Sequence, residues 1–291
     1  MQSQLTYVVN PEGIPLAIRR WGLRRPSVLL LHGFAEGGFI WNPLVAELGE
    51  SPSMLALDLR GHGDSGWGPR DRYSTDVHEE DACFVIETLT LTDLVIVGHS
   101  VGAEMAIRLA SRYDRRTRAL VIIDGGPGIS RAVTDHVVRQ FATQPRRYHS
   151  IASYANLLAT RMPFASAEVL AEYAGQALRA SPAGGFELKC DPALRDWIGL
   201  GDSNDLWPRL ERAKSPVLVV RGAASAAFSA RSAQTLAEAF RRATLVTVPD
   251  AGHAVPMDNP RGLANVIRPF LIASHPTHRP RSDNPDSSSD I

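Results

Sequence analysis

The residues best suited to covalent chemistry lie in the string Gly98-His99-Ser100-Val101-Gly102, which has the pattern G-x-S-x-G. An apolar run precedes this string and an amphipathic stretch follows it, so Ser100 is expected on a sharp turn from a strand into a helix. Such a turn exposes the serine hydroxyl as a nucleophile. Short strings of this kind also arise by chance, and an ordinary loop serine is the competing interpretation.

A serine hydroxyl needs a general base that removes its proton during attack. The chain has nine histidines, and His253 stands out in VTVPDAGHAVPMDNP, at a glycine-containing turn after the last predicted strand. We therefore predict His253 as the base, against the alternative of a surface histidine.

Attack on an acyl carbon also calls for backbone N–H groups that stabilise an oxyanion. Val101, directly after Ser100, is expected to supply one donor. The string Leu31-His32-Gly33-Phe34 ends an earlier apolar run and indicates the Phe34 N–H as the second, although the string could equally be a plain turn.

Short apolar runs separated by helix-length segments must position these residues. We predict strands over 27–33, 53–59, 93–99, 118–124, 215–222 and 243–250, an edge hairpin of 5–10 and 14–22, and helices over 77–89, 101–113, 232–242 and 260–273. Near-continuous apolar strands alternating with helices indicate an α/β fold with a mostly parallel, doubly wound sheet.

One segment interrupts this alternation. Its patterns are helical with no intervening strand, which predicts an inserted helical cap over 125–207 and a core divided into 1–124 and 208–274. The end, 275–291, is rich in proline, serine and aspartate and is expected to be a disordered tail.

In chain order, HGF, DLRGHGDS, GHSVG and DAGH resemble the α/β-hydrolase superfamily over about residues 14 to 273. The resemblance is closest to the capped serine-esterase and C–C-hydrolase branch, and it implies an eight-stranded sheet. With Ser100 at the nucleophile position, the branches that use an aspartate nucleophile are disfavoured. The resemblance implies that residues 58–65 fix a loop rather than take part in the chemistry.

The acid that orients the histidine departs from the family pattern. Relatives commonly carry it in a string resembling R-G-A-D-S-D, but here the string is RGAASAAF, with Ala226 where the acid most often stands. Asp124 ends the strand 118–124 and so lies at the same carboxyl edge of the sheet as Ser100. Some branches place the acid there, and many carry only a structural aspartate, so both interpretations of Asp124 stay open.

Several side chains are candidates for a mainly apolar substrate pocket, with ordinary core packing as the alternative. His32 and His99 flank the nucleophile and the predicted oxyanion hole, where they could touch substrate or make structural hydrogen bonds. The remaining candidates are Trp41, Tyr154, Leu157, Phe164 and Trp197.

Composition excludes several other functions. Lysine plus arginine and aspartate plus glutamate both number 31, so no overall field favours nucleic acid or an anionic membrane. No HExxH, CxxC pair or phosphate-binding glycine motif is present, which predicts no metal and no cofactor. The two distant cysteines, Cys83 and Cys190, and the absence of a targeting pattern favour the cytoplasm. Oligomeric state is left open.

The leading hypothesis is a serine hydrolase that acts on a small ester, thioester or lactone through an acyl-Ser100 intermediate. The first alternative is a non-hydrolytic enzyme of the same fold, a cofactor-independent oxygenase, lyase or cyclase, in which Asp124 and His253 deprotonate the substrate. The second is a ligand-binding protein with decayed catalytic groups.

Overall fold

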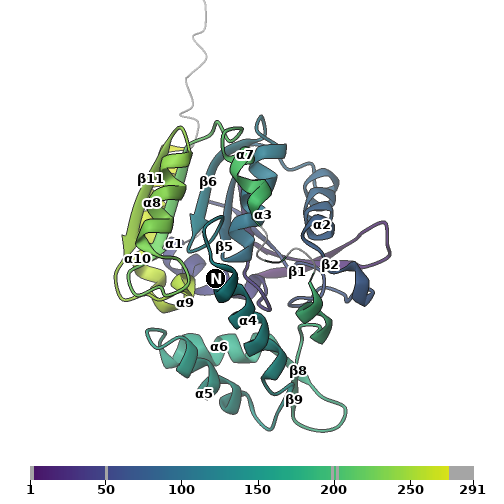
Figure 1. Cartoon of the computed structure of the whole chain (residues 1–291). Coiled ribbons are helices and arrows are strands. Elements are labelled where there is room, and N and C mark those ends of the chain that lie inside the picture. Colours follow the sequence, from purple (N-terminus) through teal and green to yellow (C-terminus); the bar gives the residue numbers. More distant parts are fainter. Residues whose placement is uncertain (1–2, 50–51, 198–199, 201–202, 275–291) are drawn as a thin grey trace, which may run out of the picture.

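The computed structural model describes residues 3–49, 52–197, 200 and 203–274. The predicted tail therefore lies outside the described residues. The centre of the protein is an eight-stranded sheet with the strand order β1-β2-β4-β3-β5-β6-β10-β11 (Figure 1). The strands are β1 (Gln4–Val9), β2 (Pro15–Trp21), β3 (Val28–Leu31), β4 (Met54–Leu57), β5 (Leu94–His99), β6 (Thr117–Ile123), β10 (Val217–Gly222) and β11 (Ala243–Val248).

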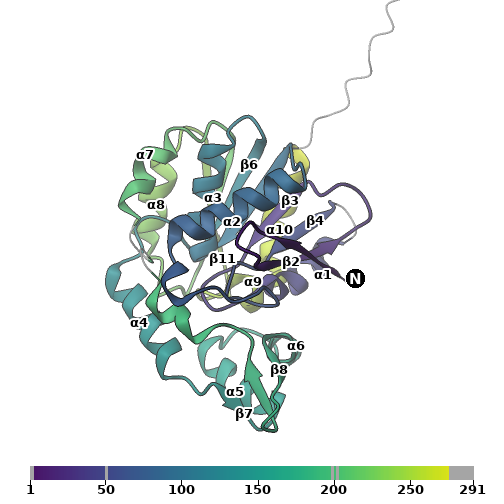
Figure 2. The same cartoon turned by 90° about the vertical axis from the view of Figure 1, so that its right-hand side faces the viewer.

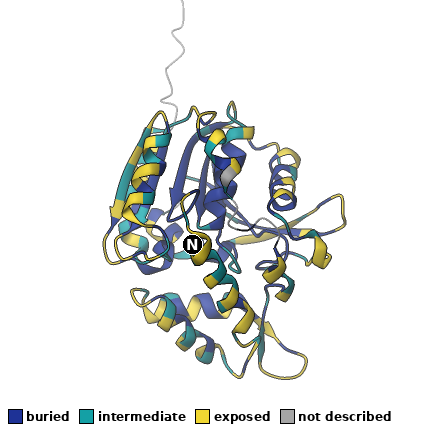
Figure 3. Ribbon diagram, viewed as in Figure 1, coloured by how far each residue is buried: buried dark blue, intermediate teal, exposed yellow. Residues whose placement is uncertain are grey.

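The predicted α/β class and the mostly parallel sheet are confirmed. β2 pairs antiparallel with β1 and with β4, and the pairs from β4 through β3, β5, β6 and β10 to β11 are parallel. The central strands are buried on both faces, which accounts for their unbroken valine, leucine and isoleucine runs. Figure 3 shows this buried sheet in dark blue.

Helices cover the sheet. α2 (Thr75–Thr88) packs against α3 (Val101–Arg112), and α1 (Asn42–Leu48) packs against α10 (Pro260–Ala273). Figure 2 shows these two pairs on opposite faces of the sheet. α8 (Ala230–Ala239) lies against β10 and β11, and the short α7 (Trp207–Leu210) and α9 (Val255–Asp258) complete the core.

The segment 125–207 is mainly helical and projects from one end of the sheet (Figures 1 and 2). Its helices are α4 (Arg131–Thr143), α5 (Ile151–Arg161) and α6 (Ala167–Ala177). The expectation that it lacks strands is wrong, because β7 (Arg147–Tyr148), β9 (Phe186–Leu188) and β8 (Leu178–Ala180) form a small antiparallel sheet. Runs this short carry no readable alternation of apolar and polar residues.

Single turns of 3-10 helix connect several of these elements. They are η1 (Gly38–Trp41), η2 (Arg70–Arg72), η3 (Pro192–Asp196) and η4 (Asn204–Leu206). η1, after β3, contacts α6, and η2, after β4, contacts η3, so the inserted segment rests on the loops that follow β3 and β4.

Candidate active site

Ser100 lies between β5 and α3 in a backbone conformation that few residues adopt, with φ 55° and ψ −121°. The turn is tight enough to require glycine on both sides. A Cβ at Gly98 would lie 2.1 Å from the Gly102 carbonyl oxygen, and one at Gly102 would lie 2.3 Å from that of Leu31. The local sequence thus sets the hydroxyl at the carboxyl edge of the sheet, at the start of α3.

His253 lies within hydrogen-bonding distance of Ser100. Its Nε2 is 3.0 Å from the Ser100 Oγ, and its Nδ1 is 2.9 Å from Oδ1 of Asp124. The His253 side chain is 32% exposed, whereas Asp124 is fully buried. The three side chains come from the ends of β5 and β6 and from the loop after β11, so strand order brings together residues more than 120 positions apart.

The Asp124 carboxylate has a donor on each oxygen. The Gly222 N–H donates to Oδ2 at 2.7 Å, and the Ser225 hydroxyl donates to Oδ1 at 2.6 Å. Ser225 in turn accepts the Phe228 N–H at 3.2 Å. Hydrogen bonds to the charged form stabilise a buried carboxylate. The string RGAASAAF, which contains Ser225, did not indicate this donor.

The predicted oxyanion donors, the Phe34 and Val101 N–H groups, make no hydrogen bond within the described part of the chain. Val101 opens α3, where a backbone N–H has no intrahelical partner. Phe34 packs its ring against Phe141 of α4 and against Trp197, with ring centroids 5.2 and 6.2 Å apart.

A second carboxylate, Glu36, lies in the same loop as Phe34 and was not singled out from the sequence. Its Oε2 accepts the Gly33 N–H at 2.7 Å and lies 3.3 Å from Nδ1 of His99. The other ring nitrogen of His99 donates to the His253 carbonyl oxygen at 2.8 Å. The loop string HGFAEGG contains a single carboxylate, and that was the signal available in the sequence.

Burial and charge shift the pKa values of Glu36 and His99 in opposite directions. Burial favours neutral forms, but the His99 ring and the Gly33 N–H outweigh it and lower the pKa of Glu36. Burial likewise works against protonated His99, yet the Glu36 carboxylate and the His253 carbonyl raise its pKa. The geometry agrees with these directions, because both ring nitrogens of His99 face acceptors and both need a proton.

The other predicted pocket residues are found in several environments. His32 is buried in the core, where its Nδ1 donates to the Gly33 carbonyl and its Nε2 accepts the Leu59 N–H. Trp41 is also fully buried. Tyr154 and Leu157 lie on α5, with Tyr154 buried and Leu157 half-buried, and Phe164 is 43% exposed on the loop after α5. Trp197 stacks on His78 at 3.8 Å and donates to Thr75.

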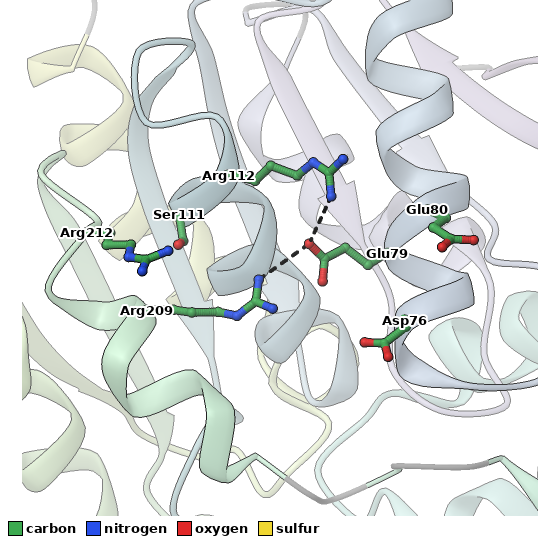
Figure 4. Close-up of a pocket in the computed structure, with 7 residues that line it drawn as sticks. All are labelled: Asp76, Glu79, Glu80, Ser111, Arg112, Arg209 and Arg212. Atoms are coloured by element: carbon green, nitrogen blue, oxygen red, sulfur yellow. Dashed lines mark hydrogen bonds and ion pairs between the residues drawn. The ribbon is translucent and has the colours of Figure 1, made fainter.

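A groove of about 430 Å³ between α2, α3 and α7 lies elsewhere in the molecule (Figure 4). Its walls carry opposite charges, and Glu79 lies 3.4 Å from Arg209 and 3.9 Å from Arg112. Arg112 ends the 12-residue α3 that begins beside Ser100, about 18 Å away along the helix. This groove is therefore separate from the Ser100 site.

Comparison with known proteins agrees with the fold and the order of the motifs. The profile of the α/β hydrolase family matches residues 28–266, which is most of the chain. The chain belongs to the α/β hydrolase family.

Two curated proteins match along nearly their whole length. The esterase Rv0045c of Mycobacterium tuberculosis is 30% identical over 280 residues, covering 93% of this chain and 91% of the esterase. The 2-(acetamidomethylene)succinate hydrolase of Mesorhizobium japonicum is 28% identical over 260 residues, covering 89% and 92%. A crystal structure of E-2-(acetamidomethylene)succinate hydrolase superposes with a TM-score of 0.85 at 26% identity, covering 93% of this chain and 100% of that one.

Two kinds of feature are absent from the described residues. No helix among them has the length and apolar character needed to cross a membrane. Within the same residues, no group of three or more histidine, cysteine, aspartate or glutamate side chains is arranged to hold a metal ion.

Proposed function

We propose that this member of the α/β hydrolase family is a serine hydrolase that cleaves a small, mainly apolar ester, thioester or lactone through an acyl-Ser100 intermediate. The observation that carries the proposal is the continuous chain of contacts from the Ser100 Oγ through His253 to Asp124, at 3.0 and 2.9 Å. The related esterase and hydrolase support a hydrolytic reaction.

In the first step, the Ser100 Oγ attacks the acyl carbon while its proton passes to Nε2 of His253. The negative charge that develops on the acyl oxygen is stabilised by the Val101 and Phe34 N–H groups. His253 then gives its proton to the leaving alcohol, thiol or ring oxygen. Asp124 stabilises the imidazolium and keeps the Nδ1 proton in place.

In the second step, His253 takes a proton from water, whose oxygen attacks the acyl-Ser100 carbon. Collapse of the new oxyanion breaks the bond to Ser100 and releases the acid, and His253 returns the proton to the Ser100 Oγ. In this scheme Ala226 supplies no carboxylate, and Asp124 takes the place of the acid expected after β10.

Aromatic side chains support a mainly apolar substrate. Phe34, Phe141 and Trp197 form one set of ring contacts beside the proposed oxyanion hole. In the inserted segment the ring of Tyr154 lies 4.7 Å from that of Tyr148 and 6.3 Å from that of Tyr173. We propose that residues 125–207 act as a cap that closes over Ser100 and selects the substrate by shape.

The proposal is tested by the fate of Ser100. A fluorophosphonate probe should label the wild-type protein at Ser100, and p-nitrophenyl butyrate should give a burst of about one equivalent of p-nitrophenol if deacylation is slower than acylation. Ser100→Ala should abolish both labelling and turnover. Turnover retained in Ser100→Ala would instead support proton abstraction by Asp124 and His253 without a covalent intermediate, and an absence of both labelling and turnover in the wild-type protein would support a binding role.

A further inference from the structure

The Glu36 carboxylate and Ser100 both lie beside Gly33. A Cβ placed on Gly33 would lie 2.7 Å from Oε2 of Glu36 and 3.1 Å from the Cβ of Ser100. Both side chains thus border the same space beside Gly33, which has no side chain of its own to fill it. Glu36 belongs to the loop that carries the Phe34 N–H, the proposed oxyanion donor.

The two oxygens of Glu36 have different surroundings. Oε2 is occupied by the Gly33 N–H and by His99. Oε1 has no hydrogen-bond partner within the described residues and is not among their solvent-shielded polar atoms. The Glu36 side chain is 13% exposed, whereas the His99 ring is 2% exposed. The pair therefore presents carboxylate oxygen to the open side and keeps the His99 ring underneath.

The inserted segment carries two buried tyrosines, Tyr154 and Tyr173. Burial raises the pKa of the Tyr154 and Tyr173 hydroxyls, and the negative charge of Glu36 adds to that effect. Neither hydroxyl has a hydrogen-bond partner in the described part of the chain. With the pKa of Glu36 lowered, a substrate beside Ser100 would meet its carboxylate as an anion.

We propose that Glu36 is a specificity-determining residue that favours esters bearing a cationic or hydrogen-bond-donating group near the scissile carbonyl and disfavours esters of dicarboxylic acids. The inference rests on the proposed hydrolase function of Ser100. An anionic substrate group beside Oε1 would be repelled, and a cation would be attracted, with only weak screening so close to buried surface. The free oxygen would accept a hydrogen bond from a hydroxyl, amide or ammonium group.

The test compares cationic substrates with neutral isosteres of the same shape and adds an anionic substrate of similar chain length. In the acyl part, p-nitrophenyl 4-(trimethylammonio)butanoate is compared with its neutral isostere p-nitrophenyl 5,5-dimethylhexanoate and with the anionic mono-p-nitrophenyl glutarate. In the leaving group, acetylthiocholine is compared with neutral S-(3,3-dimethylbutyl) thioacetate. The value of kcat/KM is measured for each substrate after subtraction of the uncatalysed rate.

For the wild-type protein we expect kcat/KM to fall by at least about threefold from the cationic to the neutral substrate in at least one series. In the acyl series we expect a further fall of at least about threefold from the neutral to the anionic substrate. Glu36→Gln keeps the side-chain size and an acceptor for the Gly33 N–H but removes the charge, and it should bring these ratios to within about twofold of unity. Glu238→Gln, which removes an exposed charge from α8, should leave the wild-type ratios unchanged.

The outcomes separate this inference from the proposed function. If Ser100 reacts with fluorophosphonate and neutral esters are cleaved, but neither series shows a charge preference, Glu36 serves only to tie the loops together and the inference is overturned. The same conclusion follows if Glu36→Gln lowers all rates equally and leaves the ratios as they are in the wild-type protein. If Ser100 does not react at all, the hydrolase proposal itself fails, independently of any charge ratio.

Discussion

Two carboxylate–histidine pairs flank Ser100, and they are built for different tasks. In the Asp124–His253 pair, the carboxylate is fully buried and the histidine is partly exposed, with Nε2 directed at Ser100. In the Glu36–His99 pair, the ring is buried and both its nitrogens face acceptors, while the carboxylate keeps one open oxygen. In the proposed mechanism the first arrangement lets His253 gain and lose a proton, whereas the second holds the His99 ring between two acceptors.

The pairs also stabilise different parts of the site. Asp124 joins the end of β6 to the loop after β10 through the Gly222 N–H and Ser225. Glu36 and His99 join the loop after β3 to the end of β5 and to the backbone of His253. Geometry at Ser100 thus depends on both pairs, but only one of them is placed to move a proton during the reaction.

The largest effect is expected from Asp124→Asn. An amide accepts at one atom only and carries no charge, so the His253 tautomer and the imidazolium both lose their support. Turnover of p-nitrophenyl butyrate should fall by about 10³- to 10⁴-fold. Asp250→Asn is a matched control, because Asp250 is exposed near His253 at φ 49°, a conformation that asparagine also tolerates. Turnover near the wild-type level in Asp124→Asn would remove Asp124 from the mechanism.

The second largest effect is expected on the free energy of unfolding of the Glu36→Gln variant. Glu36→Gln should lower the free energy of unfolding by about 2 kcal/mol near pH 5.5, because it removes a charge-assisted hydrogen bond from a buried ring. The pKa of His99 is raised above 6.5, so its contribution is fully present below that pH and is lost as the pH rises through the folded-state value. The pKa of Glu36 is lowered below 4.5, so its contribution is lost as the pH falls further.

Urea unfolding of the wild-type protein and Glu36→Gln at pH 5.5 and at pH 9 measures this effect. The difference between the two proteins should shrink at pH 9, and Glu238→Gln should show no such change. A difference that is equal at both values would mean that His99 is not charged in the folded protein. The Glu36–His99 pair would then not differ from the Asp124–His253 pair by holding a proton permanently.

A smaller effect is expected from Ser225→Ala. Loss of the hydroxyl removes one of the donors to Asp124 and leaves the Gly222 N–H and His253 in place. We expect kcat to fall by about tenfold with KM within about twofold of the wild-type value, since a hydrogen bond to a charged group contributes about 1.5–3 kcal/mol. Ser111→Ala, at the far end of α3, is the control. A rise in KM alone would contradict a role through Asp124.

Much of this site could be predicted from local sequence. The Ser100 turn is specified by glycines that must let two backbones pass closely. The prediction of His253 as the base rested on its position after the last strand. The predicted sheet followed from strands whose apolar residues are buried on both faces. These features depend on residues next to each other in the chain, so the pattern itself carries the information.

The features that the sequence did not predict depend on contacts between residues far apart in the chain. Glu36 meets His99 from 63 positions away, and nothing near Glu36 in the sequence indicates that its side chain folds back onto Gly33. Ser225 reaches Asp124 across 101 positions. The strands β7, β8 and β9 have two or three residues each and are defined only by pairing with one another.

The smallest effect is expected from Ala226→Asp, which restores a carboxylate where the family pattern has one. His253 has a single Nδ1 proton to donate, and Oδ1 of Asp124 already lies 2.9 Å away. Ala226 is exposed, so an added carboxylate would face solvent, where a charge contributes little. We expect turnover within about threefold of the wild-type value. A gain of about tenfold or more in the same esterase assay would mean that Asp124 orients His253 poorly. In the proposed arrangement the end of β10 and the loop after it supply hydrogen-bond donors instead of the acid. The Gly222 N–H and the Ser225 hydroxyl position the carboxylate of Asp124, which follows β6.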